Sequence, residues 1–433
     1  MKQVCVKIVW GMLLAFTVSC SNDFDSDTKT PEDIQKSVQN DLNKRTYQEA
    51  LDIAQNSISI LEHGNSVTRS IRANRTIDRN AIIVGSQHNI TRSASEQDDT
   101  LFYVFNFCND EGFAVVSASK NTDGLLAVTE SGHYSANETS EIEGFDMFMD
   151  LAENYVTNSM SKINVRPRPP YDFTELKDSS AVHESYSGPY VTVRWGQTYP
   201  EGIFCSNQSA GCANTAMAQV MTYYEYPTAI ALTYEGADQT IQELNWSEIK
   251  KHVSTLEDSA LPTYRYAIGR LCRQLGQIAN SRYESDGNTY TSLGGIESTM
   301  QFLGYQTEGW KEYNSTCLTG CAQRGQIVIM AGSRYLASGE KVGHIWLLDG
   351  AYTRTQEAFT WSKRMIELEW NLVYYHTMTS YYYHINWGFD GNNNGYFCKD
   401  VFDTSKVINP DTNNNYVNRN YDNDIQYLVV YHE

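Results

Sequence analysis

Two side chains, Cys212 and His344, have the types and contexts that nucleophilic catalysis requires. Cys212 follows Ser209-Ala210-Gly211 and opens a run of small residues that predicts a helix ending near Tyr224. A helix N-terminus lowers the pKa of a thiol, because free N–H groups and aligned peptide dipoles favour the thiolate there. Cys212 is therefore a candidate nucleophile, and a buried structural cysteine at a helix start is the alternative.

His344 is the candidate base. It follows Gly343 and heads an apolar strand that ends at Leu348. A thiolate nucleophile needs an imidazole partner that is held rigidly. The alternative is a structural histidine at a strand edge, and His384, in a neighbouring predicted strand, is the rival candidate.

Three further residues could support this pair. Asn386 and Trp387 lie in the predicted strand 383–388, and an amide beside an indole can hold and shield an imidazole. The side-chain amide of Gln197, together with the backbone N–H of Cys212, could donate to the oxyanion that forms on a substrate carbonyl.

The cysteine count is consistent with a free thiol. Of nine cysteines, Cys5 and Cys20 lie in or at the end of a predicted export signal, residues 1–20, which leaves seven. An odd number in an exported protein leaves at least one thiol unpaired. Cys317 and Cys321 have the spacing of a small disulfide loop, but a zinc half-site would need a nearby His or a second Cys pair. We expect no metal and no cofactor.

The elements that must position these residues follow from the hydrophobic pattern. Runs at 101–107 and 113–118 predict a hairpin, and apolar residues at helical spacing from 145 to 155 predict a helix that covers it. Helices are then predicted at 212–224, 264–279 and 296–303, and strands at 326–331, 344–348 and 381–387. Helices followed by strands indicate an α+β domain with a mainly antiparallel sheet.

Composition predicts the domain boundaries. The proline-rich start of residues 166–189 resists helix and marks an exposed linker where a protease could cut. The predicted parts are an export signal (1–20), a tether with an opening helix near Tyr47 to Leu61 (21–94), a small α+β domain (95–165), this linker, and a second α+β domain (190–433).

The N-terminus predicts export. Lys2 and Lys7 precede or flank an apolar run, 8–18, that is too short for a stable membrane anchor. Because Cys20 follows this run directly, the segment resembles a bacterial lipoprotein signal with Cys20 lipidated, and an ordinary cleaved signal is the alternative. We expect an outer-membrane or cell-surface lipoprotein, or a mature form released from it. The net charge of -19 argues against a nucleic-acid partner.

In chain order, Gln197, Gly211-Cys212, Gly343-His344 and Asn386-Trp387-Gly388 resemble the streptopain family of papain-like cysteine peptidases. The similarity is detailed at GCANTAMAQVMTYYEYP, VGHIWLLDGAY and HINWGFDGNNNGYF. Upstream, residues 103–130, which include GFAVVSASK, resemble the inhibitory propeptide of that family.

The resemblance implies a papain-like α+β fold and a zymogen, a cysteine endopeptidase that acts on polypeptides and is inhibited by its own propeptide. Carried over, Cys212 is the nucleophile, His344 the general base and acid, and Gln197 an oxyanion donor. Either Asn386 or Trp387 orients the imidazole.

Two departures from the family pattern affect these expectations. Phe389 replaces a second tryptophan, and the insertion 352–380 is expected to form an extra hairpin near the site. Two alternative functions remain open: a catalytically silent surface lipoprotein that binds peptides, and a Cys-His amidase or transglutaminase on the same scaffold.

Overall fold

The structure is a computed structural model, which describes residues 43–432 except 65–74, 86–89, 92–99, 136–141, 161–174, 238–239, 337, 364–368 and 405–424. The described residues all belong to one compact unit, Asn43–Glu433. The predicted export signal, with Cys20, lies outside the described residues. Within them, no helix is long and apolar enough to cross a bilayer.

The first part of this unit is a small sheet with two helices. Its elements are α2 (Tyr47–Gly64), β1 (Ile82–Gly85), β2 (Ile90–Thr91), β3 (Thr100–Asn106), a 3-10 turn (Cys108–Asp110), β4 (Phe113–Ser117), β5 (Leu125–Thr129) and α3 (Glu143–Met160). β3 and β4 form the predicted hairpin, with Val104 opposite Val115. Phe145, Phe148 and Leu151 of α3 are buried, which confirms the predicted covering helix.

Helices dominate the next part of the chain. They are α4 (Cys212–Tyr224), α5 (Trp246–Ile249), α6 (Pro262–Ile278), α7 (Leu293–Phe302) and α8 (Ser315–Gln323), with small hairpins β7 (Ala229–Ala231) and β8 (Ile241–Glu243), and β9 (Arg282–Tyr283) and β10 (Thr289–Tyr290). The chain enters α4 through Gly211, whose φ of 82° suits glycine. Three of these helices, α4, α6 and α7, were predicted from the sequence.

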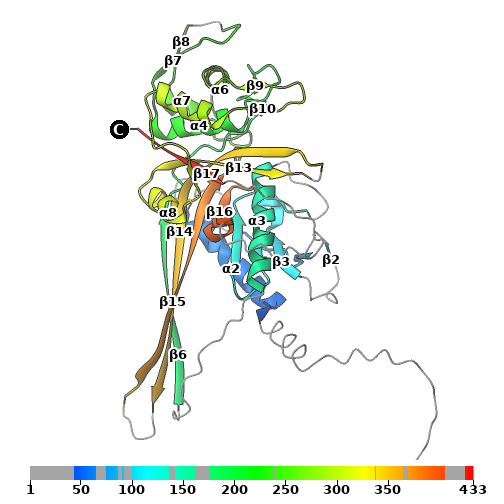
Figure 1. The fold of residues 1–433 in the computed structure, drawn as a ribbon, viewed down its shortest axis with the longest axis vertical. Coiled ribbons are helices and arrows are strands. Elements are labelled where there is room, and N and C mark those ends of the chain that lie inside the picture. The colour runs from blue at the N-terminus through cyan, green and yellow to red at the C-terminus, as the bar shows by residue number, and fades with distance from the viewer. Residues whose placement is uncertain are drawn as a thin grey trace, which may run out of the picture. The chain divides into compact units, whose positions relative to one another are not determined.

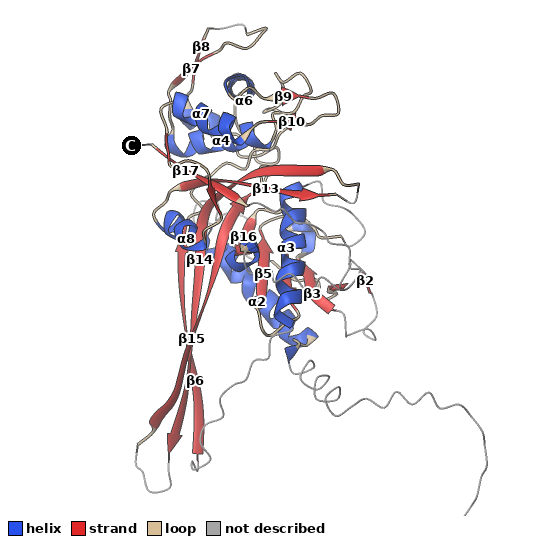
Figure 2. Cartoon of the chain, in the orientation of Figure 1, coloured by secondary structure: helices blue, strands red, loops and turns tan. Residues whose placement is uncertain are grey.

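One antiparallel sheet runs through the unit. Its remaining strands are β6 (Glu175–Ser187), β11 (Gln306–Thr307), β12 (Lys311–Glu312), β13 (Ile327–Tyr335), β14 (Lys341–Lys363), β15 (Asn371–Asn386), β16 (Gly395–Cys398) and β17 (Gln426–Tyr431), and a 3-10 turn spans Lys399–Phe402. The order is β11-β17-β13-β14-β15-β16-β5-β4-β3-β1-β2, while β12 pairs with β17 and β6 with β14 (Figures 1 and 2). β5 of the first part thus pairs directly with β16 of the second.

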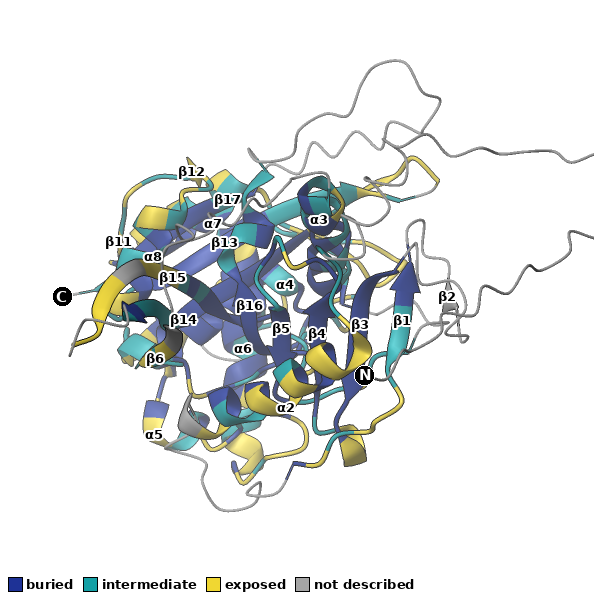
Figure 3. Ribbon diagram, turned by 90° about the horizontal axis from the view of Figure 1, so that it is seen from below, coloured by how far each residue is buried: buried dark blue, intermediate teal, exposed yellow. Residues whose placement is uncertain are grey.

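Two hydrophobic cores lie on opposite faces of the central strands. Alternate residues of a strand point to opposite faces. On β13, Val328 and Met330 belong to the core that α3 shares, whereas Ile327 and Ile329 belong to the core that contains α4 and α6. The segment 327–331 of β13, which lies between the two cores, is accordingly buried (Figure 3). The α+β class with a mainly antiparallel sheet is confirmed.

The insertion at 352–380 forms a hairpin, but the expectation that it lies near the site is wrong. It is the outer half of β14 and β15, and β6 joins it along 351–363 as a third strand (Figure 1). At about 3.3 Å per residue, Tyr352 lies roughly 26 Å along β14 from His344. Residues 175–187 of the predicted linker are therefore a paired strand.

Candidate active site

Cys212 begins α4, as predicted, and its thiol is half-buried. Burial raises the pKa of this thiol above its ordinary value, although the backbone N–H groups of Ile345, Ala213 and Cys212 itself act in the opposite direction. The N–H of Ile345 belongs to the residue that follows His344. The start of the helix and the head of β14 therefore meet at the sulfur.

His344 lies at the inner end of β14, opposite Gly332 of β13, and is 5% exposed. Its Nε2 is 2.8 Å from the backbone carbonyl oxygen of Trp387, so Nε2 carries the proton and donates it there. Burial lowers the pKa of His344 to about 4, despite this hydrogen bond. Within the described residues, no hydrogen bond joins His344 to Cys212.

Aromatic rings surround the imidazole. The ring of Trp346 stacks with that of His344 at 6.2 Å between centroids, Phe389 lies at 5.5 Å and Trp387 at 6.4 Å. The indole of Trp387 is fixed by its own donor, since Nε1 donates to the carbonyl of Asn393 at 3.0 Å. Phe389, noted in the sequence as a departure from the family pattern, thus packs against the imidazole.

Gln197 lies on the segment that leads to the helix start. Its carbonyl accepts from the backbone N–H of Ala210 at 2.7 Å, and the hydroxyl of Thr215 donates to the preceding carbonyl, Gly196, at 2.9 Å. These two bonds attach the Gln197 backbone to the region of Cys212. The side chain of Gln197 is half-buried beside this junction.

No hydrogen bond joins Asn386 to the imidazole of His344 among the described residues. Its amide donates to Gln219 Oε1 of α4 at 2.8 Å and to the carbonyl of Val193 at 3.1 Å, and its Oδ1 accepts from the N–H of Gly388 at 3.1 Å. Asn386 therefore joins β15 to the helix that carries Cys212. The group that bonds His344 is the main chain of the next residue, Trp387.

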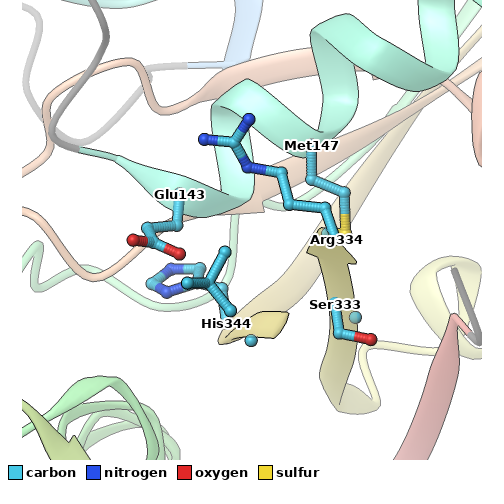
Figure 4. Close-up of a pocket in the computed structure, with 8 residues that line it drawn as sticks. Glu143, Met147, Ser333, Arg334 and His344 are labelled. Carbon is cyan, nitrogen blue, oxygen red and sulfur yellow. The ribbon is translucent and has the colours of Figure 1, made fainter. Parts of the chain in front are cut away.

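α3 covers the imidazole. A Cβ atom at Gly144 would lie 2.5 Å from His344 Cδ2 and 2.6 Å from Trp387 Cε3, so only glycine lets the helix approach this closely. Glu143, beside it, lies next to the imidazole (Figure 4). The negative charge of Glu143 also raises the pKa of the Cys212 thiol.

Ion pairs hold α3 at this place. Arg334 of β13 pairs with Asp146 at 2.8 Å and with Asp150 at 3.5 Å. Met147, which lies between Asp146 and Asp150 in α3, packs against Gly332 of β13 (Figure 4).

His384, the rival base, lies elsewhere. Its Nδ1 is 2.5 Å from Asp349 and its Nε2 is 3.5 Å from Glu130, so both ring nitrogens face carboxylates. Nothing in the described residues brings a thiol to this imidazole.

Cysteine and metal chemistry elsewhere is limited. The seven cysteines of the described residues are free thiols, and Cys317 and Cys321, whose spacing could form a small disulfide loop, lie within α8 without a disulfide bond. The described residues also contain no group of three His, Cys, Asp or Glu that could hold a metal ion.

Sequence reasoning missed Gly144, Glu143, Thr215 and Gln219. Thr215 and Gln219 are four positions apart in α4, so they lie on the same face of the helix as Cys212. Polar residues on the helix face of a candidate nucleophile were a usable signal in the sequence. Gly144 and Glu143 gave none, because their contacts lie about two hundred residues away in the chain.

Two family models match this chain. The model described as peptidase C10 family matches residues 192–397, and the model described as Spi protease inhibitor matches residues 35–156. The inhibitor match thus begins at residue 35, upstream of residue 95 where the sequence places the start of the propeptide, and includes α2 and most of α3.

Curated relatives agree with these matches. Streptopain of Streptococcus pyogenes is 23% identical over 331 residues, which are 70% of this chain and 75% of that protein. The thiol protease/hemagglutinin PrtT of Porphyromonas gingivalis is 21% identical over 296 residues, 62% of this chain and 33% of that protein. A prointerpain A fragment of Prevotella intermedia aligns with a TM-score of 0.49 and 16% identity, covering 83% of this chain and 100% of that one.

Proposed function

This chain belongs to the peptidase C10, or streptopain, family and is a cysteine peptidase with its inhibitor segment in the same chain, and from that premise we propose that it is an exported zymogen endopeptidase. In this proposal Cys212 is the nucleophile and His344 its base. The polypeptide substrate is cut through a thioester intermediate. Below, "inhibitor segment" means residues 43–160 and "peptidase segment" means residues 190–432.

The observation that carries the proposal is the cover that Gly144 forms over His344, at the same junction where the Cys212 thiol meets β14. Burial raises the pKa of Cys212 and lowers that of His344 to about 4. Both groups are therefore neutral at pH 7, whereas a reactive pair needs thiolate and imidazolium. This is the electrostatic state expected of a precursor that is held inactive.

Removal of α3 reverses the pKa shifts of both Cys212 and His344. Water then reaches the imidazole, which raises its pKa towards the ordinary value of about 6.5. The charge of Glu143 leaves with the helix, and the free N–H groups at the start of α4 favour the thiolate. Proton transfer from Cys212 to His344 becomes favourable only in this state.

The reaction follows from the positions of these groups. The Cys212 thiolate attacks the substrate carbonyl carbon, and the oxyanion accepts hydrogen bonds from the Cys212 N–H and the Gln197 amide. His344 then protonates the leaving amine as the C–N bond breaks, which leaves a thioester. Water, deprotonated by His344, attacks the thioester, releases the acid and regenerates the thiol.

Trp387 rather than Asn386 is the group that we propose to orient the imidazole. The bond from Nε2–H to the Trp387 carbonyl leaves Nδ1 as the basic nitrogen. This arrangement fixes the tautomer that can accept the proton of Cys212. Asn386 acts through Gln219 on the placement of α4.

Export and lipidation at Cys20 complete the proposal and rest on the sequence pattern alone. Metabolic labelling with a radiolabelled fatty acid tests the anchor: label on the wild-type chain but not on Cys20→Ala supports it. Equal labelling of both chains, or none, refutes it.

The catalytic proposal is tested by mass spectrometry of a peptide library incubated with the processed protein. Cut backbones that disappear in Cys212→Ala support the peptidase. Deamidated or cross-linked glutamine side chains would instead indicate an amidase or transglutaminase, and an unchanged library a peptide-binding protein. Cys317→Ala, which removes another half-buried thiol on α8, is the matched control and should cut like the wild type.

A further inference from the structure

Another buried histidine, His384 of the peptidase segment, lies where that segment meets the inhibitor segment. His384 is 4% exposed, and its ring nitrogens face Asp349 Oδ1 at 2.5 Å and Glu130 Oε1 at 3.5 Å. Glu130 is 4% exposed and Asp349 is fully buried. The imidazole is thus enclosed between two carboxylates, one from each segment.

The main chain delivers Glu130 to this place. Glu130 directly follows β5, whose last residue, Thr129, pairs with Gly395 of β16. The N–H of Glu130 donates to the carbonyl of Asn394 at 2.7 Å, and the hydroxyl of Ser131 donates to the carbonyl of Gly391 at 2.7 Å. The inhibitor segment therefore adds a strand to the edge of the peptidase sheet, and a carboxylate at the end of that strand enters the interior.

Asp349 is independently fixed in the peptidase segment. It lies where the register of β14 and β15 shifts between Leu348 and Gly350, and the extra residue of such a bulge redirects its side chain. Its second oxygen accepts from the N–H of Val191 at 2.9 Å. The Asp349–His384 pair consequently does not depend on the inhibitor segment.

The surrounding charges favour the ion pair. Burial would raise the pKa of Glu130, but His384, Arg194 and Arg75 outweigh it and hold this pKa at about 2. Burial would likewise lower the pKa of His384, but Asp349 and Glu130 raise it to about 10. The other titratable groups that face the pair are Tyr396 of β16 and, beyond it, Tyr186 of β6.

We propose that His384 and Asp349 form a carboxylate-binding site of the peptidase segment, and that its ligand in the precursor is Glu130. The inhibitor segment is then held by an ion pair that is separate from the cover over His344. This inference rests on the proposed function as a zymogen. The ligand class is a carboxylate carried at the end of an extended strand that pairs with β16.

The site tolerates the loss of this ligand. A buried ion pair that loses one partner normally leaves an uncompensated charge, which is strongly destabilising. Here protonated His384 keeps Asp349 as its partner after Glu130 departs. The peptidase segment therefore loses no essential counter-charge when the inhibitor segment is released, which suits a contact that must form in the precursor and break on maturation.

The test measures hydrogen exchange in the intact precursor carrying Cys212→Ala, so that the result does not depend on any peptidase activity. In Glu130→Gln, the amides of β5 and β16 should exchange about 10-fold faster or more, because a buried charge contact is lost. The matched control is Glu49→Gln, which breaks a pair with Lys120 inside the inhibitor segment. It should leave these amides unchanged.

A double-mutant cycle separates this role from a general loss of stability. In a His384→Gln background, Glu130→Gln should add little further exchange. The proposal would be overturned if the amides of β5 and β16 exchanged equally fast in Glu130→Gln and in the Glu49→Gln control. It would also be overturned if Glu130→Gln raised their exchange rate by the same factor with and without His384. If Glu130→Gln lacks the circular dichroism of a folded chain, Glu130→Asp replaces it as the test variant. Because Glu130→Asp keeps the charge on a shorter side chain, its β5 and β16 amides should exchange at a rate between those of the wild type and an uncharged variant. Exchange at the wild-type rate in Glu130→Asp would count against the proposal.

Discussion

Substituting Gly144 by alanine tests whether contact with α3 keeps the active site inactive. The new methyl group would lie 2.5 Å from His344 Cδ2, 2.6 Å from Trp387 Cε3 and 2.7 Å from Trp387 Cζ3. Both rings are buried, and Trp387 is held by its own hydrogen bond, so neither can move aside easily. We expect α3 to be displaced from the site.

The magnitude follows from two opposing effects. Overpacking of a well-packed contact costs about 1–3 kcal/mol, while alanine in place of glycine stabilises the helix itself by about 1 kcal/mol. The net loss is at most about 2 kcal/mol, and its midpoint of about 1 kcal/mol corresponds to an open fraction that is roughly 5-fold larger. Because only the open form offers a thiolate, the alkylation of Cys212 should accelerate by a similar factor.

The assay is the rate at which iodoacetamide labels Cys212 in the unprocessed chain, read by mass spectrometry. Gly294→Ala on α7 is the matched control, since no atom lies within 4 Å of a Cβ there, and its labelling rate should equal that of the wild type. A Gly144→Ala chain that unfolds at a lower temperature but labels no faster would refute the reasoning.

Three other predictions address the same contact and its neighbours. The covered His344 has a pKa of about 4, and uncovering restores about 6.5, so protonation of His344 favours uncovering as the pH falls from 6.5, by at most roughly 30-fold at pH 5. Burial raises the pKa of the neighbouring Glu143 carboxyl, so its protonation opposes part of this effect. Hydrogen exchange of α3 in the Cys212→Ala precursor measures the net change. Arg334→Gln, which removes the pair with Asp146, should raise the same exchange about 5-fold, for a loss of about 1 kcal/mol. Asn386→Ala should lower the free energy of unfolding by about 1–3 kcal/mol through its bond to Gln219, without shifting the pH–rate profile of the processed enzyme.

Each of these predictions has its own control. A His344→Gln precursor should lose the acid-dependent exchange, and if exchange still rises at pH 5, another group drives it. Lys120→Gln breaks a more exposed ion pair within the inhibitor segment and should leave the exchange of α3 as in the wild type. A shift of the acid limb in Asn386→Ala would show that the amide, not the main chain of Trp387, sets the basicity of the imidazole.

The sequence predicted those parts of the site that depend on local pattern. Small residues after Gly211 identify the helix of Cys212, and an apolar strand identifies the position of His344, because each signal lies within a few residues of its target. β6 was not predicted as a strand: its sequence, ELKDSSAVHESYS, lacks the apolar alternation of a strand, and its order comes from pairing with β14. Glu130 was missed for the same reason, since its partner is more than two hundred residues away.

The two contacts of the inhibitor segment respond differently to acid, and this sets an order of events. The cover over His344 weakens below pH 6.5, because protonation of the imidazole opposes burial. The pKa of Glu130, held at about 2, is lowered from its ordinary value, so the contribution of its ion pair is present above about pH 4.5 and is lost only as the pH falls towards 2. Between pH 6.5 and 4.5, α3 can therefore leave the active site while β5 stays on β16. A precursor opened in this way exposes Cys212 while the inhibitor segment remains bound, so uncovering of the site precedes release of the segment.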